Sequence, residues 1–141
     1  MRSRPSVTGT IDLALPEFED PPADPMPLLV SWVDAAEKLG VLEPYNVAIA
    51  TTDDDGDVTN RFVLAKVFDR DGMTFATNTS SAKGRQLTAH PRAAAVLYWR
   101  ETRQQVRLTG PVEVLTAAES DEIWADRSVQ SQAAATASLQ S

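Results

Sequence analysis

The sequence of 141 residues contains no cysteine and a single histidine. A disulfide framework, a thiolate zinc site, an iron–sulfur cluster and a cysteine nucleophile are therefore excluded, and one chain cannot supply several histidines to a metal ion. No stretch approaches the roughly 20 apolar residues of a membrane span, and residues 1–10 lack the apolar run of a secretory signal. The expectation is a cytoplasmic protein without a membrane partner.

Basic side chains are fewer than acidic ones, 13 against 20, and the formal net charge is −7. Nucleic acids and anionic membranes repel such a surface, so neither is an expected partner. The charge is uneven, because residues 1–60 hold 12 acidic and 3 basic side chains while residues 61–141 hold 8 acidic and 10 basic ones. An anionic ligand is therefore expected to bind after Asn60.

Proline is concentrated near the N-terminus, where six of the nine prolines precede Leu28. This pattern predicts an extended arm over residues 1–23, followed by a domain over residues 24–141. The apolar side chains of the arm could pack on a neighbouring surface, or the arm could be a partly disordered leader. Asp24 and Pro25 indicate the N-cap and first residue of an amphipathic helix that ends before Gly40.

The rest of the chain alternates between strand and helix patterns. The predicted strands cover residues 46–52, 58–68, 73–77, 93–99 and 104–115, and further helices cover 81–89 and 117–127. Asp–Gly turns join the first three strands, a Thr116-x-x-Glu119 capping box opens the last helix, and Gly110–Pro111 indicates a bulge or bend within the last strand. This order predicts an α+β fold with an antiparallel barrel, and not a parallel doubly wound sheet.

Two sets of polar residues are candidates for ligand binding. Arg61, Lys66, Lys83 and Arg85, with the hydroxyl and amide groups of residues 77–81 at a helix N-terminus, could hold one phosphate group or form a solvated basic face. Alternation also places Gln105, Arg107 and Thr109 on one strand face, which could contact a flat heteroaromatic edge or simply face water.

Other polar residues favour structural roles. His90, directly before Pro91, is interpreted as a partner of a helix C-terminus and not as a catalytic base. The acidic run at residues 53–57 lacks the ligand spacing and closing Glu of a calcium loop, and it is interpreted as a solvated hairpin turn.

Several segments, in order, resemble the pyridoxamine 5′-phosphate oxidase family, whose members are homodimeric split β-barrels with flavin mononucleotide (FMN) at the subunit interface. The segments are DPM at 24–26, RFVLAK at 61–66, FATN at 75–78, SAKGR at 81–85, QQVR at 104–107 and QS at 140–141. Residues 8–26 and the LYWRET segment at 97–102 look most like the branch that oxidises reduced phenazine carboxylic acid intermediates with O2.

The resemblance implies a set of site residues. Arg61, Thr77 and Lys83 would bind the FMN phosphate, and Lys66, the implied catalytic residue, would lie near flavin and substrate. The implied cofactor-binding set is Arg61, Phe62, Val63, Leu64, Lys66, Ala76, Thr77, Ala82, Lys83, Gln105, Gln140 and Ser141, and Lys66, Arg127 and Ser131 would bind substrate. Arg61 and Lys66 are an odd number of residues apart, so a bulge or strong twist is expected if both touch one ligand.

Some residues depart from the family pattern. Ala82 stands where an arginine usually assists Lys83, which predicts weaker FMN retention. Ile123 stands where the vitamin oxidases have a tyrosine that binds substrate phosphate, which favours the phenazine substrate over pyridoxamine or pyridoxine 5′-phosphate. The sequence ends before the region in which the family carries a Trp, an Arg and an Arg-x-His motif, so a non-catalytic FMN-binding or dimerisation module is a further alternative.

Overall fold

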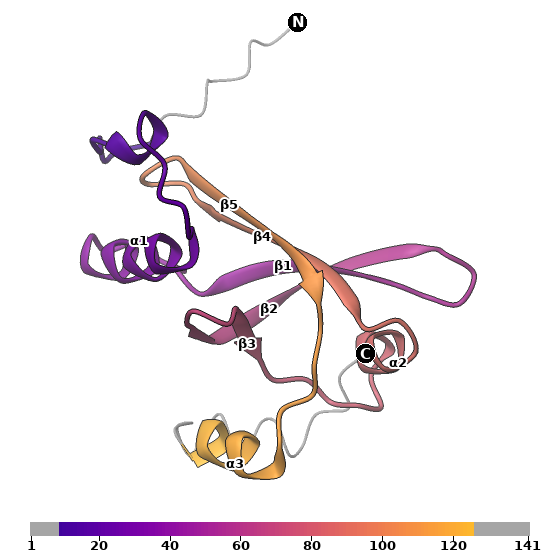
Figure 1. Ribbon diagram of the computed structural model, residues 1–141. Helices are drawn as coiled ribbons and strands as arrows, with labels where there is room; N and C mark the ends of the chain where they lie inside the picture. Colours follow the sequence, from indigo (N-terminus) through magenta and orange to yellow (C-terminus); the bar gives the residue numbers. More distant parts are fainter. Residues whose placement is uncertain (1–8, 126–141) are drawn as a thin grey trace, which may run out of the picture. The chain divides into compact units, whose positions relative to one another are not determined.

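The computed structural model describes residues 9–125, which form a five-stranded sheet with helices (Figure 1). The elements are, in chain order, the 3-10 helix η1 (Pro16–Phe18), α1 (Met26–Lys38), β1 (Asn46–Thr52), β2 (Val58–Phe68), β3 (Met73–Phe75), α2 (Ala82–Ala89), β4 (Arg92–Trp99), β5 (Gln104–Pro111) and α3 (Ala117–Ala125). The strand order is β3-β2-β1-β4-β5, with β2 and β3 antiparallel. The predicted α+β class is confirmed.

The described residues divide into two compact units. Unit 1 holds residues 9–49, 61–76 and 95–108, and unit 2 holds residues 50–60, 77–94 and 109–125. Unit 1 therefore contains α1 and β3 whole, unit 2 contains α2 and α3 whole, and the four longer strands contribute residues to both.

The core of unit 1 forms between α1 and the strands. Apolar residues three and four apart give α1 one buried stripe, in which Leu29, Val33 and Ala36 are at most 6% exposed. The strands add the buried side chains Val47, Ile49, Val63, Ala65, Leu97 and Trp99. The indole Nε1 of Trp99 donates a hydrogen bond to the carbonyl oxygen of Pro44 at 3.0 Å, so this large side chain is buried without an unsatisfied donor.

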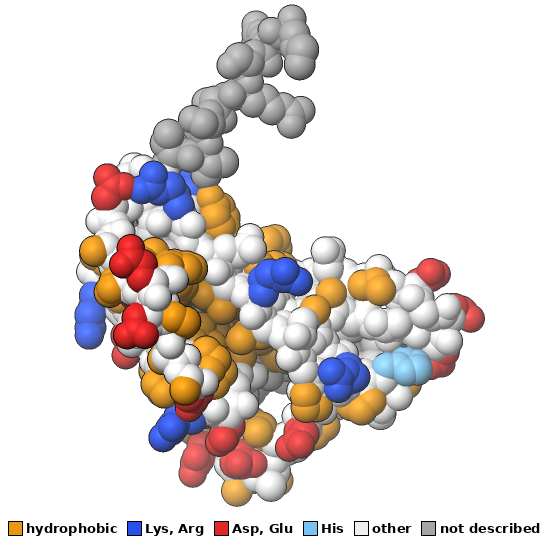
Figure 2. Space-filling model, turned by 45° about the horizontal axis from the view of Figure 1, so that its top comes forward, with side chains coloured by type: hydrophobic (Ala, Val, Ile, Leu, Met, Phe, Trp, Pro, Cys, Tyr) orange, Lys and Arg blue, Asp and Glu red, His pale blue; other side chains and the backbone are white. Residues whose placement is uncertain are grey.

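The N-terminal residues 9–23 pack against unit 1. The backbone N–H groups of Thr10 and Ile11 donate to the carbonyl oxygen of Glu101 at 2.9 and 3.0 Å. The Phe18 ring lies 5.9 Å from that of Trp32 on α1. The arm therefore contacts the rest of unit 1 through Thr10, Ile11 and Phe18, and residues 18–23 are exposed. Acidic and exposed hydrophobic side chains are interspersed over the surface around α1 (Figure 2).

Unit 2 contains the hairpin turn between β1 and β2. Asp53 Oδ1 accepts hydrogen bonds from the N–H groups of Asp55 and Asp57 at 3.1 and 2.9 Å, and Gly56 has a φ of +87°. The acidic residues thus stabilise their own turn, as predicted. His90, the C-cap residue of α2, lies with Nε2 at 2.8 Å from Asp54 Oδ1, and it therefore connects the helix end to this turn.

The predicted strand ends were too late in two places. β3 ends at Phe75 and not at Thr77, and β5 ends at Pro111 and not at Leu115. Proline has no N–H to continue a ladder, and the N–H of Val112 donates instead to the carbonyl oxygen of Pro91 at 2.9 Å. The bulge or bend predicted at Gly110–Pro111 therefore falls at the end of β5 and not in the middle of a longer strand.

The helix starts follow the predicted capping residues. Glu119 Oε2 accepts hydrogen bonds from the N–H and Oγ1 of Thr116 at 2.8 and 2.6 Å, which confirms the capping box and lowers the pKa of Glu119. α1 begins at Met26, one residue later than predicted, and Asp24 Oδ1 accepts from the Met26 N–H at 3.0 Å. Among residues 9–125, no helix has the length and apolar character needed to cross a membrane.

Candidate functional site

A turn rich in hydroxyl groups precedes α2 in unit 2. Ser81 is the N-cap of α2, and its Oγ accepts a hydrogen bond from the Gly84 N–H at 3.1 Å and donates one to the Asn78 carbonyl oxygen at 2.7 Å. Thr77 Oγ1 lies 3.4 Å from the same Ser81 Oγ. The cap fixes the first helical turn, whose backbone N–H groups and dipole favour an anion.

Lys83 is buried at the start of α2. It is 5% exposed, and Ser81 beside it is 2% exposed. A lysine is rarely buried to this degree, because its ammonium group loses solvation, and a buried charge near a helix N-terminus is a candidate for ligand binding. Thr77 and Lys83, two of the residues predicted for the phosphate site, lie at this turn and the start of α2 in unit 2, as does Ala82 of the predicted cofactor-binding set.

Gly84 allows the turn to lie directly against the helix. A Cβ atom at this position would be 2.4 Å from the Asn78 carbonyl oxygen and 2.7 Å from that of Thr79. The sequence analysis missed this role, although a glycine inside a helix is unfavourable and signals a close approach of backbone. Gly84 therefore sets the distance between the turn and α2.

Gln86 attaches α2 to the hairpin of unit 2 and was also missed. Its Oε1 accepts a hydrogen bond from Thr51 Oγ1 at 2.6 Å and lies 3.3 Å from Thr59 Oγ1, so one amide oxygen joins α2 to β1 and β2. Gln86 is 35 residues from Thr51 and 27 from Thr59 in the sequence, and a single sequence does not indicate that polar residues so far apart are in contact. The contact holds α2 against β1 and β2 within unit 2.

Arg61 lies on β2 in unit 1. Its Nη1 donates a hydrogen bond to the carbonyl oxygen of Ile49 at 3.4 Å, and partial burial lowers the pKa of the guanidinium. Arginine remains charged even after such a shift. The side chain is therefore a half-buried cation on β2.

Lys66 occupies a bulge in β2. Ala65 pairs with Phe75 and Val67 with Thr74, so two steps on β2 correspond to one step on β3 and Lys66 is the extra residue. The bulge breaks the alternation that would otherwise point Arg61 and Lys66 to opposite faces. The irregularity expected between these two residues is thus present.

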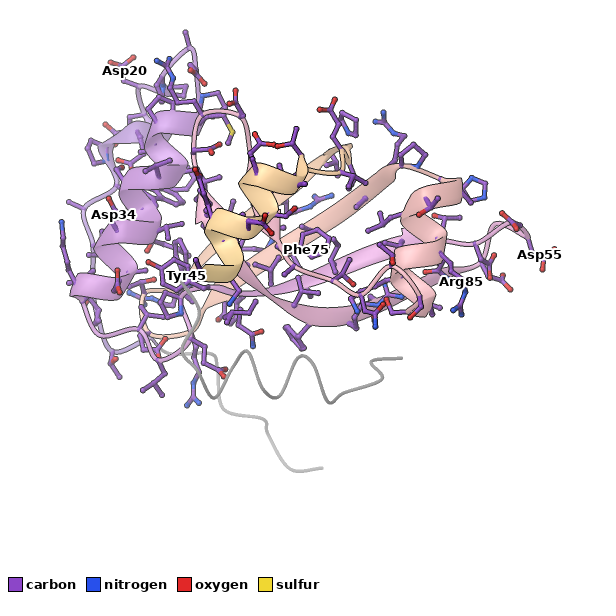
Figure 3. All side chains as sticks on the ribbon, turned by 90° about the horizontal axis from the view of Figure 1, so that it is seen from below. Asp20, Asp34, Tyr45, Asp55, Phe75 and Arg85 are labelled. Atoms are coloured by element: carbon purple, nitrogen blue, oxygen red, sulfur yellow. The ribbon has the colours of Figure 1, made fainter. Side chains whose placement is uncertain are left out.

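Lys66 lines a hollow of about 220 Å³ in unit 1, together with Val30, Val33, Asp34, Tyr45, Val67 and Phe68. The rings of Tyr45 and Phe68 stack at a centroid distance of 6.4 Å. Burial, and then the hydrogen bond that Tyr45 donates to Glu37 at 3.0 Å, raise the pKa of Tyr45. Figure 3 labels Asp34 on α1 and Tyr45 close to it. The hollow combines one ammonium group with aromatic and acidic walls.

The remaining predicted residues of the described part lie on strands or loops of unit 1. On β2, Phe62 and Leu64 are 70% and 55% exposed, whereas Val63 is buried. Gln105 on β5 is exposed, as alternation predicts, and Ala76 lies in the loop after β3. Arg127, Ser131, Gln140 and Ser141 lie outside the described residues.

Comparisons with known proteins agree with these features. The family model described as pyridoxamine 5′-phosphate oxidase matches residues 34–141. A dihydrophenazinedicarboxylate synthase of Pseudomonas chlororaphis is 43% identical over 86% of this chain and 55% of its own length. A pyridoxine/pyridoxamine 5′-phosphate oxidase of Azorhizobium caulinodans is 48% identical over 84% of this chain and 56% of its own length. The chain thus spans little more than half the length of these relatives.

The structural comparison concerns the fold directly. A crystal structure of PhzG from Burkholderia lata 383, in complex with tetrahydrophenazine-1-carboxylic acid, matches with a TM-score of 0.88 and 40% identity over 94% of this chain and 66% of that one. The likeness confirms the predicted α+β split β-barrel. With the family model matching most of its length, the chain belongs to the pyridoxamine 5′-phosphate oxidase family.

Proposed function

We propose that this chain carries the FMN-binding part of an oxidoreductase. The observation that carries the proposal is the hydroxyl-rich turn before α2 with its buried Lys83. Capped backbone N–H groups, the helix dipole and an ammonium group together match a phosphate dianion. Bound FMN would supply the acceptor for a hydride and would pass two electrons to O2, giving hydrogen peroxide.

The residues of the chain have separate proposed tasks. Lys83, Thr77 and the first turn of α2 hold the phosphate, and Arg61 is a separate proposed FMN ligand on β2. Lys66 orients the reduced substrate and the flavin ring through its ammonium group, a role that fits its position at a bulge beside the hollow of unit 1. Gln105 offers its amide to a ring edge from an exposed strand position.

We propose a reduced phenazine carboxylic acid as the substrate. Two relatives at 43% and 40% identity are named dihydrophenazinedicarboxylate synthase, which supports this class. The substrate would lose two electrons and two protons, and O2 would take them up. The ammonium group of Lys66 would attract the carboxylate of such a ring system.

Pyridoxamine or pyridoxine 5′-phosphate is the second candidate substrate. Relatives at 45% and 48% identity are named pyridoxine/pyridoxamine 5′-phosphate oxidase, so overall identity does not separate the two classes. Ile123, a half-buried residue of α3, has no hydroxyl to donate to a substrate phosphate, and it therefore favours the carboxylic acid.

The proposal includes a homodimer with FMN at its interface. Phe62, Leu64 and Tyr98 are 70%, 55% and 49% exposed, and each alternates along its strand with buried neighbours. These side chains belong to the face of the unit 1 strands that turns away from the core. Exposed apolar side chains grouped on a strand face are typical of a protein interface.

Replacing Phe62 and Leu64 together by serine is expected to raise the dimer dissociation constant at least about a hundredfold, because two large apolar side chains per protomer lose their burial. Sedimentation velocity over a range of protein concentrations measures this shift. Leu42→Ser is the matched control, since Leu42 is 86% exposed in a loop of unit 1. A wild-type chain that sediments as a monomer even with excess FMN contradicts the dimer.

The function is tested by the visible spectrum and by turnover. After incubation with FMN and gel filtration, the protein is expected to retain a flavin spectrum in a dimer-sized peak. Reduced phenazine carboxylic acids and pyridoxamine 5′-phosphate are then compared for O2 consumption. Retained flavin with neither substrate oxidised supports the non-catalytic flavin module, and a failure to retain flavin contradicts the FMN-binding proposal.

A further inference from the structure

Arg85 extends toward the N-terminal end of α2. Ala82 and Arg85 are three residues apart, so they share one face of the helix, and long helical side chains lean toward the helix N-terminus. The guanidinium Nη1 of Arg85 donates a hydrogen bond to the carbonyl oxygen of Ser80, which lies before the N-cap residue. The side chain therefore reaches back along the helix face that carries Ala82.

The stretch of sequence around Arg85 is basic. Residues 77–94 contain Lys83, Arg85 and Arg92 and no Asp or Glu. Among the described residues, Arg85 forms no ion pair within 4 Å. Arg85 is exposed, whereas Lys83 is 5% exposed, so its guanidinium is open to a solute at the turn. Figure 3 labels Arg85 at the first turn of α2.

We propose that Arg85 is a second cation for the flavin phosphate and acts beside Lys83 at the turn of residues 77–81. This inference rests on the proposed FMN-binding function. An arginine at position 82 would place a guanidinium on the same face of α2, three residues earlier. Because position 82 is an alanine, Arg85 supplies that charge by extending toward the N-terminal end of the helix. Arg85 thereby adds to the preference of the site for FMN over flavins without a phosphate.

The test compares two flavins that differ in the phosphate alone. FMN and riboflavin are titrated, by fluorescence quenching, into wild-type protein, Arg85→Ala and Arg85→Lys. Arg85→Ala is expected to weaken FMN binding roughly fivefold to tenfold and to leave riboflavin binding within about twofold. Arg85→Lys should recover part of the loss. Arg92→Ala removes another exposed arginine of unit 2 and is expected to change neither affinity.

A second comparison tests whether positions 82 and 85 serve the same phosphate. Ala82→Arg is expected to tighten FMN binding, and Arg85→Ala in that background should cost no more than about twofold. An unchanged ratio of FMN to riboflavin affinity in Arg85→Ala overturns the role of Arg85. Equal losses for both flavins also overturn it, because they indicate an effect on the helix. A wild-type protein that binds neither flavin contradicts the proposed function and, with it, this inference.

Discussion

Lys83→Met is expected to weaken FMN binding by about thirtyfold while the protein keeps its fold. A hydrogen bond to a charged group contributes about 1.5–3 kcal/mol, and Lys83 would make such a bond to a dianion from a site with little water. Methionine retains most of the apolar length that packs at this position, where Lys83 is 5% exposed. Isothermal titration of FMN into the apo protein measures the loss.

The free energy of unfolding separates a ligand effect from a folding effect. We expect Lys83→Met to change it by less than about 1 kcal/mol, because removal of a buried charge offsets the lost contacts of the ammonium group. Lys38→Met, at the exposed end of α1, is the control and should bind FMN like the wild type. An FMN affinity that Lys83→Met leaves unaltered would remove Lys83 from the phosphate site.

Gly84→Ala is expected to destabilise the protein by about 1–3 kcal/mol and to lower FMN binding at the same time. Alanine has the better helix propensity by about 1 kcal/mol, so propensity alone predicts stabilisation. The new Cβ would lie 2.4 Å from a backbone oxygen of Asn78 and 2.7 Å from that of Thr79, and neither backbone oxygen can turn away as a flexible side chain could. The steric cost of the new Cβ is therefore expected to exceed the gain in helix propensity.

Gly110→Ala provides the matched control for this prediction. Gly110 also belongs to unit 2, its φ is not positive, and a Cβ there has no atom within 4 Å. Urea unfolding of both variants, followed by far-ultraviolet circular dichroism, should show a loss for Gly84→Ala alone. If Gly84→Ala proves as stable as the wild type, the turn can move away from α2 and the close approach has no functional role.

Short sequence patterns predicted the helix cap and the hairpin turn correctly. The Thr116 and Glu119 capping box forms as predicted, and the Asp53 and Gly56 turn closes the hairpin between β1 and β2. Such features depend on side chains a few residues apart, so the sequence contains them fully. The end of β5 depends on a distant residue as well. Pro111 has no N–H to continue the ladder, and the N–H of Val112 donates to the carbonyl oxygen of Pro91.

The candidate site was predictable in composition and not in geometry. The sequence indicated Arg61, Lys66 and Lys83 from their charge and from a family resemblance. It indicated a bulge or strong twist between Arg61 and Lys66, but not that Lys66 is the extra residue or that Gln86 joins α2 to two strands. Both features depend on pairing between residues distant in sequence, which a single sequence does not specify.

The sequence by itself determined the class of protein, the positions of the helices and strands, and the polar residues before α2, because propensity, capping and charge are local properties. The tertiary structure alone decided which of these residues are buried and how close they lie. Lys83 is nearly inaccessible to solvent, Gly84 lies against the backbone of residues 78–79, and Lys66 departs from the alternation of side chains along β2. These outcomes depend on packing between distant segments, where the excluded volume of one segment fixes the position of another.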